Sequence, residues 1–166
     1  MKKRFLSCFM ALALCLTLLP ASAFAEGSES VEGGAAQVTA ADGTEQVYSS
    51  FNDAWSVAIE SAGSTLKLLS DVTLPNGKNG LSVSEGSFTL DLNNKTLKGA
   101  IWNQLLEVSG TANITIKNGS LVNTRTGPAA SASSTNLVAL KISGGTVALD
   151  NVNLTSGIDS EDKYAP

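Results

Sequence analysis

A short pattern that occurs three times between Leu81 and Leu154 constrains the fold more than any other feature of the sequence. Each copy reads apolar, any, apolar, any, Asn, any, any, apolar, and the copies are Phe88–Leu97, Asn113–Leu121 and Thr146–Leu154. Because side chains alternate between the two faces of a strand, both apolar positions before the asparagine should point to one face. The pattern therefore predicts three strands that present equivalent apolar faces to a core.

The spacing of the copies predicts how these strands are arranged. The pattern asparagines Asn94, Asn118 and Asn151 are 24 and then 33 residues apart. The nine additional residues fit a loop, because residues 124–134 are rich in Gly, Pro, Ala and Ser. A period near 24 residues without helices is typical of solenoids, in which each strand pairs with its counterpart one repeat away. Asparagine tolerates left-handed backbone angles, so we expect these three residues to form structural corners.

The same alignment predicts which side chains stack on one another. Its apolar columns are Leu90, Ile114 and Val147; Leu92, Ile116 and Leu149; and Leu97, Leu121 and Leu154. An additional strand precedes each copy, at Leu81–Val83, Leu106–Val108 and Leu140–Ile142. Each unit should therefore contain a strand, a glycine turn, a second strand, an asparagine corner and the start of a third face.

Two other folds compete with a solenoid of strands. A leucine-rich repeat has a similar period, but its signature places two residues between the second apolar position and the asparagine, and here there is one. An antiparallel β-sandwich would explain the strands and hairpin-type dipeptides such as Asn76-Gly77. It would not explain three asparagine-centred copies that align with one another, so we favour the solenoid.

The segment before the repeats predicts one helix near residues 50–62. Ser50 is a suitable N-cap and Gly63 a suitable C-terminal stop. The apolar residues between them follow helical spacing, and they are Phe51, Ala54, Trp55, Ala58, Ile59 and Ala62. We interpret this helix as a lid over the open end of the β-structure rather than as a partner-binding helix.

The first 25 residues have the features of a secretory signal peptide. Met1–Arg4 is basic, Phe5–Leu19 is apolar, and Ala23–Ala25 is a small-x-small cleavage site. The apolar run is shorter than the roughly 20 residues that a membrane span needs. We therefore expect a secreted or cell-surface protein with no membrane segment after removal of the signal peptide. Both cysteines, Cys8 and Cys15, lie in the removed part, so we expect neither disulfides nor a thiolate metal site.

Removal of residues 1–25 would leave 141 of the 166 residues. We expect a disordered leader over residues 26–45, one β-domain over 46–157 and a polar tail over 158–166. Three of the 11 basic residues and none of the 15 acidic residues are removed, so the remainder has a net charge of −7. This acidity argues against a nucleic-acid partner. Because neither a capping element nor a cell-wall sorting signal follows Leu154, we hypothesise that the chain is the N-terminal part of a longer surface protein, or a truncated one.

Several of these segments resemble a known family. Leu68–Leu74 and Phe88–Leu97, preceded by the helix residues Asp53–Trp55 and Ala58–Ile59, are similar to pectate-lyase-like β-helix domains of bacterial secreted and surface proteins. Asn94 stands where that family usually has Gly. The resemblance implies an all-β fold, a right-handed parallel β-helix of about three to four coils with an N-terminal capping α-helix. It does not imply one activity, because such domains serve as adhesins, stalks and carbohydrate enzymes.

After removal of residues 1–25, the residues available for chemistry are carboxylates, lysines and one arginine. The chain contains no histidine, which excludes Ser–His and Cys–His nucleophile systems. Resemblance to pectate-lyase-like enzymes would imply acidic residues that bind Ca²⁺ and a basic residue that abstracts a proton. The candidates for these roles are Asp91, Lys117, Asp150 and Arg125. In the alignment Asn93, Lys117 and Asp150 share an outward column, and an exposed Lys117–Asp150 ion pair is a simpler interpretation than catalysis.

We therefore predict a secreted or cell-surface module with a structural or adhesive role. Its expected ligand class is carbohydrate, either an extracellular polysaccharide or a host or cell-wall glycan. The alternative is a polysaccharide lyase or glycoside hydrolase, which needs several carboxylates that converge in one groove. Because the sequence offers only Asp91 and Asp150, in different columns, we favour the module. We expect no cofactor, with Ca²⁺ as the one metal that the resemblance suggests, and the sequence leaves the oligomeric state open.

Overall fold

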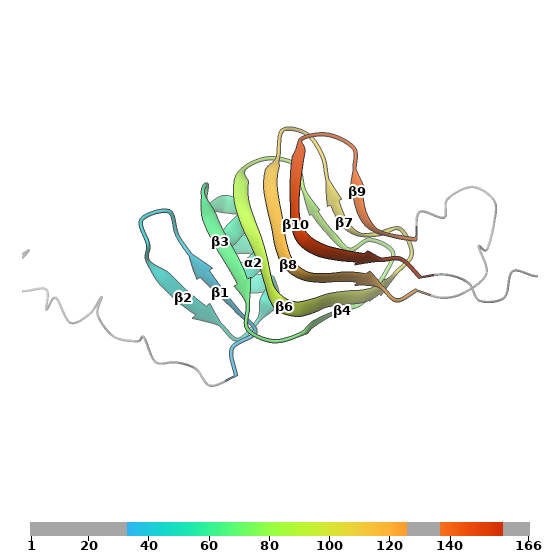
Figure 1. The fold of residues 1–166 in the computed structure, drawn as a ribbon, viewed down its shortest axis with the longest axis horizontal. Helices are drawn as coiled ribbons and strands as arrows, with labels where there is room; N and C mark the ends of the chain where they lie inside the picture. The colour runs from blue at the N-terminus through green and yellow to red at the C-terminus, as the bar shows by residue number, and fades with distance from the viewer. Residues whose placement is uncertain (1–32, 126–136, 158–166) are drawn as a thin grey trace, which may run out of the picture. The chain divides into compact units, whose positions relative to one another are not determined.

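The computed structural model describes residues 33–125 and 137–157, which form ten strands and one helix (Figure 1). The helix is α2 (Phe51–Glu60). The strands are β1 (Ala36–Thr39), β2 (Glu45–Tyr48), β3 (Ser64–Leu68), β4 (Val72–Gly77), β5 (Leu81–Val83), β6 (Ser87–Ile101), β7 (Gln104–Val108), β8 (Asn113–Asn123), β9 (Val138–Ile142) and β10 (Thr146–Thr155). One sheet has the order β10-β8-β6-β3-β1-β2, with β4 also paired to β6, and the other has the order β5-β7-β9.

The prediction of an all-β, right-handed parallel β-helix is wrong. The fold is mixed α/β, because α2 packs on the strands and contributes to their core. The larger sheet is itself mixed: β3, β6, β8 and β10 pair in parallel, but β1 is antiparallel to both β2 and β3. The repeat carries information about the strands that contain it. The repeat carries no information about how the preceding segment pairs with the sheet. The antiparallel strands β1 and β2 belong to that preceding segment.

β1 lies inside the range 26–45 that was expected to be a disordered leader. Ala36 and Val38 are buried on its inner face, while Gln37 and Thr39 alternate with them. A strand this short, with two small apolar residues, gives too weak an alternation to stand out from the surrounding Gly, Ala and Ser. Residues 26–32, the expected signal peptide over 1–25 and the expected polar tail over 158–166 lie outside the described residues.

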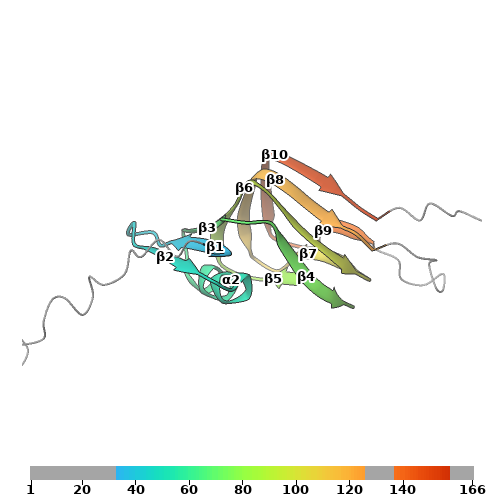
Figure 2. The ribbon, with the colours of Figure 1, turned by 90° about the horizontal axis from the view of Figure 1, so that it is seen from below.

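The helix lies where the apolar spacing predicts it, and it covers one end of the core. Its first N–H groups are capped by Ser50, whose Oγ accepts a hydrogen bond from the Asp53 N–H at 3.4 Å. Trp55 is 6% exposed, and its ring meets the Phe88 ring edge-on with a centroid distance of 5.5 Å. Figure 2 shows α2 beside β1, β2 and β3, away from β10.

The register of the three repeat strands differs from the alignment before the corner. Phe88 pairs with Ile114, and Ile114 with Val147; in the next inward column the residues are Leu90, Ile116 and Leu149. We call the parts of each strand before and after its corner the two arms. The predicted columns for the first arm are therefore wrong by two residues in β6. After the corner, Leu97, Leu121 and Leu154 do stack in register, as the alignment predicts.

The difference arises from a longer corner in β6. Four positions separate Asp91 from Lys95, but two separate their partners Lys117 and Gly119. Both Asn93 and Asn94 have left-handed backbone angles, with φ of 48° and 58°, and they accommodate the additional residues. An alignment on the asparagines matches Asn94 with Asn118 correctly but cannot detect this insertion.

The second sheet repeats the same stacking at smaller scale. Leu81, Leu106 and Leu140 pair in register, as do Val83, Val108 and Ile142. Tight turns connect these strands to the larger sheet. Gly110 occupies one of them with φ of 56°, and a Cβ there would collide with the carbonyl oxygen of Ser84 in the preceding turn. Glycine is therefore required at this position for both its backbone angle and its close approach.

Candidate functional site

Three connections meet where β4, β6 and β8 end. The backbone N–H of Trp102 donates to the Gly77 carbonyl at 3.0 Å, and the N–H of Asn103 donates to the Lys78 carbonyl at 3.0 Å. The segments after β4 and β6 thus continue the parallel pairing of the strands that precede them. These bonds fix the backbone on which the exposed side chains stand.

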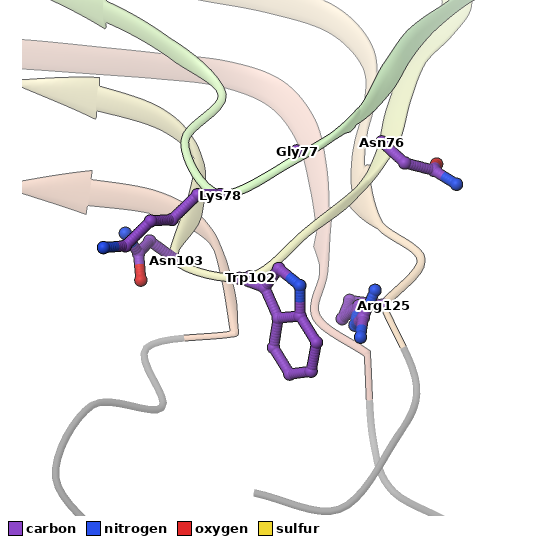
Figure 3. A pocket seen from close by; sticks show the side chains of 6 residues that line it. All are labelled: Asn76, Gly77, Lys78, Trp102, Asn103 and Arg125. Atoms are coloured by element: carbon purple, nitrogen blue, oxygen red, sulfur yellow. The ribbon is translucent and has the colours of Figure 1, made fainter. Parts of the chain in front are cut away.

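The side chains at this point line a surface depression of about 540 Å³ (Figure 3). We call it the Trp102 surface, and its residues are Asn76, Gly77, Lys78, Trp102, Asn103 and Arg125. It combines an aromatic ring, two side-chain amides and two cations. Small-molecule sites typically combine an apolar surface with a few polar groups that set orientation.

Trp102 and Arg125 form the centre of the Trp102 surface. The guanidinium carbon of Arg125 lies 3.3 Å from the centroid of the Trp102 ring, which is a cation–π contact. Trp102 remains 37% exposed, so part of the indole is open to solvent. The Nε of Arg125 is buried and has no hydrogen-bond partner within the described chain. The contact with Arg125 restricts the ring and leaves a preformed aromatic surface.

Asn123 holds the backbone on either side of this pair. It is fully buried; its Nδ2 donates to the Ile101 carbonyl at 2.9 Å, and its Oδ1 accepts from the Ile101 N–H at 3.1 Å. The same Oδ1 also accepts from the Arg125 N–H at 3.2 Å. One buried amide therefore links the residue before Trp102 to Arg125, and its own desolvation is compensated by these bonds.

The rim of the Trp102 surface contains amide side chains, and one of them pairs with Asn79, which lies outside the lining residues. Asn103 Nδ2 donates to Asn79 Oδ1 at 2.5 Å, between the equivalent connections after β4 and β6. An asparagine side chain offers both donors and an acceptor. Together with Lys78, the rim can therefore form hydrogen bonds with ligands that carry hydroxyl or carboxylate groups.

The predicted candidates Asp91, Lys117 and Asp150 lie at the corner of the larger sheet instead. The register places Lys117 opposite both Asp91 and Asp150, so the outward column contains Asp91 where the alignment placed Asn93. Lys117 Nζ lies 3.5 Å from Asp91 Oδ2, and the expected ion pair with Asp150 is not formed. The fourth candidate, Arg125, belongs to the Trp102 surface, so the structure does not bring the four together.

Asp91 has a structural explanation. Its Oδ1 accepts the Asn93 N–H at 2.9 Å and the Asn118 Nδ2 at 3.3 Å, while its Oδ2 faces Lys117. These bonds satisfy the carboxylate and support the left-handed residues of two corners. The corner asparagines Asn94, Asn118 and Asn151 have φ of 58°, 58° and 54°, a conformation that few other residues adopt at low cost.

A further charged group links the last two strands of the smaller sheet. Glu107 Oε1 lies 2.9 Å from Lys141 Nζ and accepts a hydrogen bond from Ser143 Oγ at 3.0 Å. Hydrogen bonding to Lys141, followed by that to Ser143, lowers the pKa of Glu107 from its ordinary value of 4.5. Gln104 Nε2 also donates to Glu107 Oε2 at 2.7 Å.

The sequence reasoning missed the most informative residues of the Trp102 surface. Trp102 and Asn103 lie between β6, which ends at Ile101, and β7, which begins at Gln104. A tryptophan between two predicted strands could have indicated an exposed aromatic residue at the boundary between two faces. The proximity of Arg125 could not have been inferred, because it depends on the exact stacking of the third connection on the second.

No family model, curated protein or solved structure matches the chain. The resemblance to pectate-lyase-like domains therefore stays a prediction. Among the residues that the structure describes, no three His, Cys, Asp or Glu side chains cluster in a way that could hold a metal ion. The helix of the described ranges, α2, does not combine the length and the apolar character that crossing a membrane requires.

Proposed function

We propose that the protein is a secreted or cell-surface module that binds carbohydrate through the Trp102 surface and serves adhesion. The observation that carries this proposal is the partly exposed indole of Trp102, restricted by Arg125 in a depression that Asn76 and Asn103 also line. Export is supported by the basic and apolar pattern of residues 1–25.

The chemistry of the surface suits a sugar ring. One face of a pyranose presents C–H groups, which pack on an aromatic ring, while its hydroxyl groups need donors and acceptors around the edge. Trp102 supplies the aromatic area, and Asn76 and Asn103 supply amides that both donate and accept. Lys78 and Arg125 add charged donors, which form the stronger hydrogen bonds.

The surface is also fixed before a ligand arrives. The backbone of Trp102 and Asn103 is held by hydrogen bonds to the preceding connection, and Asn123 ties Ile101 to Arg125. A preformed site loses less conformational entropy on binding than a mobile one. Weak individual contacts with sugar hydroxyls can therefore still give measurable affinity.

A glycan array probed with the purified full chain, with and without Ca²⁺, tests this function. We expect binding to a subset of polysaccharides, and we expect Trp102→Ala to weaken it by about tenfold or more, which corresponds to roughly 1.4 kcal/mol. Val57→Ala is the matched control, because Val57 is 36% exposed on α2, outside the Trp102 surface. Binding that is unchanged in the Trp102 variant, or no binding to any glycan, would contradict the proposal.

A further inference from the structure

The end of the fold formed by β9 and β10, which we call the open end, exposes large apolar side chains. Ile142 is 53% exposed, Leu149 46% and Leu154 42%. Elsewhere in the described chain, only Val57 and Trp102 are large apolar residues with comparable exposure. The open end thus holds most of the exposed apolar residues in one place, which is typical of an interaction surface.

These side chains occupy core positions. Leu149 follows Leu90 and Ile116 in its column, and both of those are fully buried. Leu154 likewise follows Leu97 and Leu121, and Ile142 follows Val83 and Val108. Their exposure therefore comes from the lack of a next layer among the described residues, and not from an outward orientation.

The backbone at the open end is equally available. β10 is ten residues long and pairs with β8 on one side, and within the described ranges nothing pairs with its other side. The opposite edge of the same sheet is β2, which is four residues long and exposes Glu45 and Gln46. Short, charged edges resist pairing, whereas a long edge with apolar side chains favours it.

We propose that the open end binds the open end of a second copy of this chain, with the two β10 strands antiparallel about a two-fold axis. The inward residues of β10 are Val147 and Leu149 before the corner, and Val152 and Leu154 after it. If the axis passes between Asp150 and Asn151, Val147 lies opposite Leu154 and Leu149 opposite Val152. The sequence of β10 is therefore complementary to itself in this register.

The one charge on β10 is not placed directly against its own copy in this arrangement. Asp150 is the charged residue of β10, and the proposed register places it opposite Asn151 of the other copy, with the two Asp150 residues diagonal to each other across the axis. Like charges directly opposite each other on paired strands would be destabilising. Each contact also occurs twice, once on each side of the axis, as a two-fold interface requires.

The covered end of the fold explains why the assembly should stop at two copies. A head-to-tail stack would need the open end of one copy to pair with the end that carries α2 and β2. There α2 already covers the core, and the β2 edge is short and polar. Only open-end to open-end contact is left, and it closes after two copies.

Sedimentation velocity of the purified full chain, from about 1 to 100 µM, tests the proposal. We expect a concentration-dependent monomer–dimer equilibrium, and we expect Leu149→Lys with Leu154→Lys to shift it to monomer. Val57→Lys, which places the same charge on α2, should leave the dimer intact. Circular dichroism would establish that both variants keep their strands. A chain that is monomeric throughout, larger polymers, or a dimer that survives the paired lysines would each overturn the proposal.

A cross-linking experiment tests the register without disturbing the apolar residues. The register places Ala148 opposite Asn153 of the other copy, and opposite residues on antiparallel strands are close enough for a disulfide. In a background with Cys8→Ser and Cys15→Ser, we expect Ala148→Cys with Asn153→Cys to give an oxidised covalent dimer. Ala148→Cys alone is the matched control and should not. Equal cross-linking of both variants, or of neither, would overturn the assigned pairing.

Discussion

The two ends of the core show what one further layer does to the same kind of side chain. At the covered end, Phe51 and Trp55 of α2 are each 6% exposed and complete the packing around Phe88. At the open end, Leu149 and Leu154 continue the same apolar columns and stay close to half exposed. The hydrophobic stabilisation that a side chain contributes is roughly proportional to the apolar area that it buries. A leucine at the open end should therefore stabilise the fold far less than its counterparts inside.

The first way to sharpen this comparison is to truncate one large side chain at each end. We expect Trp55→Ala to lower the free energy of unfolding by about 3–5 kcal/mol, because it removes a buried ring from the contact with Phe88. Leu154→Ala should cost less than about 1 kcal/mol, since its surroundings are already open. Urea unfolding at a concentration that keeps the protein monomeric measures both values. Equal costs would show that the open end is packed as well as the covered end.

A smaller effect is expected at the start of α2. Ser50→Ala removes the side-chain oxygen that accepts from the Asp53 N–H, and we expect a loss of about 1 kcal/mol. Ser50→Asp should restore most of it, because aspartate also caps helices and its charge is favourable at a helix N-terminus. Thermal unfolding of the three proteins gives the comparison. If the Ser50→Ala variant is as stable as the original protein, the Ser50 cap does not stabilise α2.

The smallest effect concerns the ionic contact between Glu107 of β7 and Lys141 of β9. Because the folded protein lowers the pKa of Glu107, the contact stabilises the fold above the ordinary pKa of 4.5, and this contribution is lost as the pH falls through the lowered folded value. We expect Glu107→Gln to reduce the dependence of the urea midpoint on pH below about 4.5. At neutral pH the change should be small, because the group is near the surface. A variant with the same acid sensitivity as the original protein would contradict this assignment.

Local features of the fold could be predicted from the sequence, and its overall class could not. The helical spacing around Trp55 and the three asparagine-centred strands each depend on residues that are close in the chain, and the structure contains both. The mixed sheet depends on β1, whose pairing with β3 brings together Val38 and Leu66. That contact is specified by tertiary packing, and no local pattern in Ala36–Thr39 shows it.

The candidate site shows the same division. Arg125 was chosen from the sequence for its charge, and the structure places it on Trp102, which the sequence patterns did not select. Asp91 and Lys117 were chosen separately, and their adjacency follows from a two-residue insertion in β6 that an asparagine alignment hides. Residue chemistry can be read from the sequence, but which groups meet depends on register.

That insertion has a consequence for how chains of this kind can vary. Five positions separate Lys67 from Val72 across the corner between β3 and β4; their partners in β6, Asp91 and Leu97, are six apart, and the next pair in β8, Lys117 and Leu121, are four apart. The arms on both sides of each corner nevertheless pair with their neighbours. The number of residues in a corner can therefore differ from one layer to the next without changing the pairing of the arms. Insertions and deletions should be tolerated at the corners and rejected within the arms, where a single residue would turn every following side chain to the wrong face.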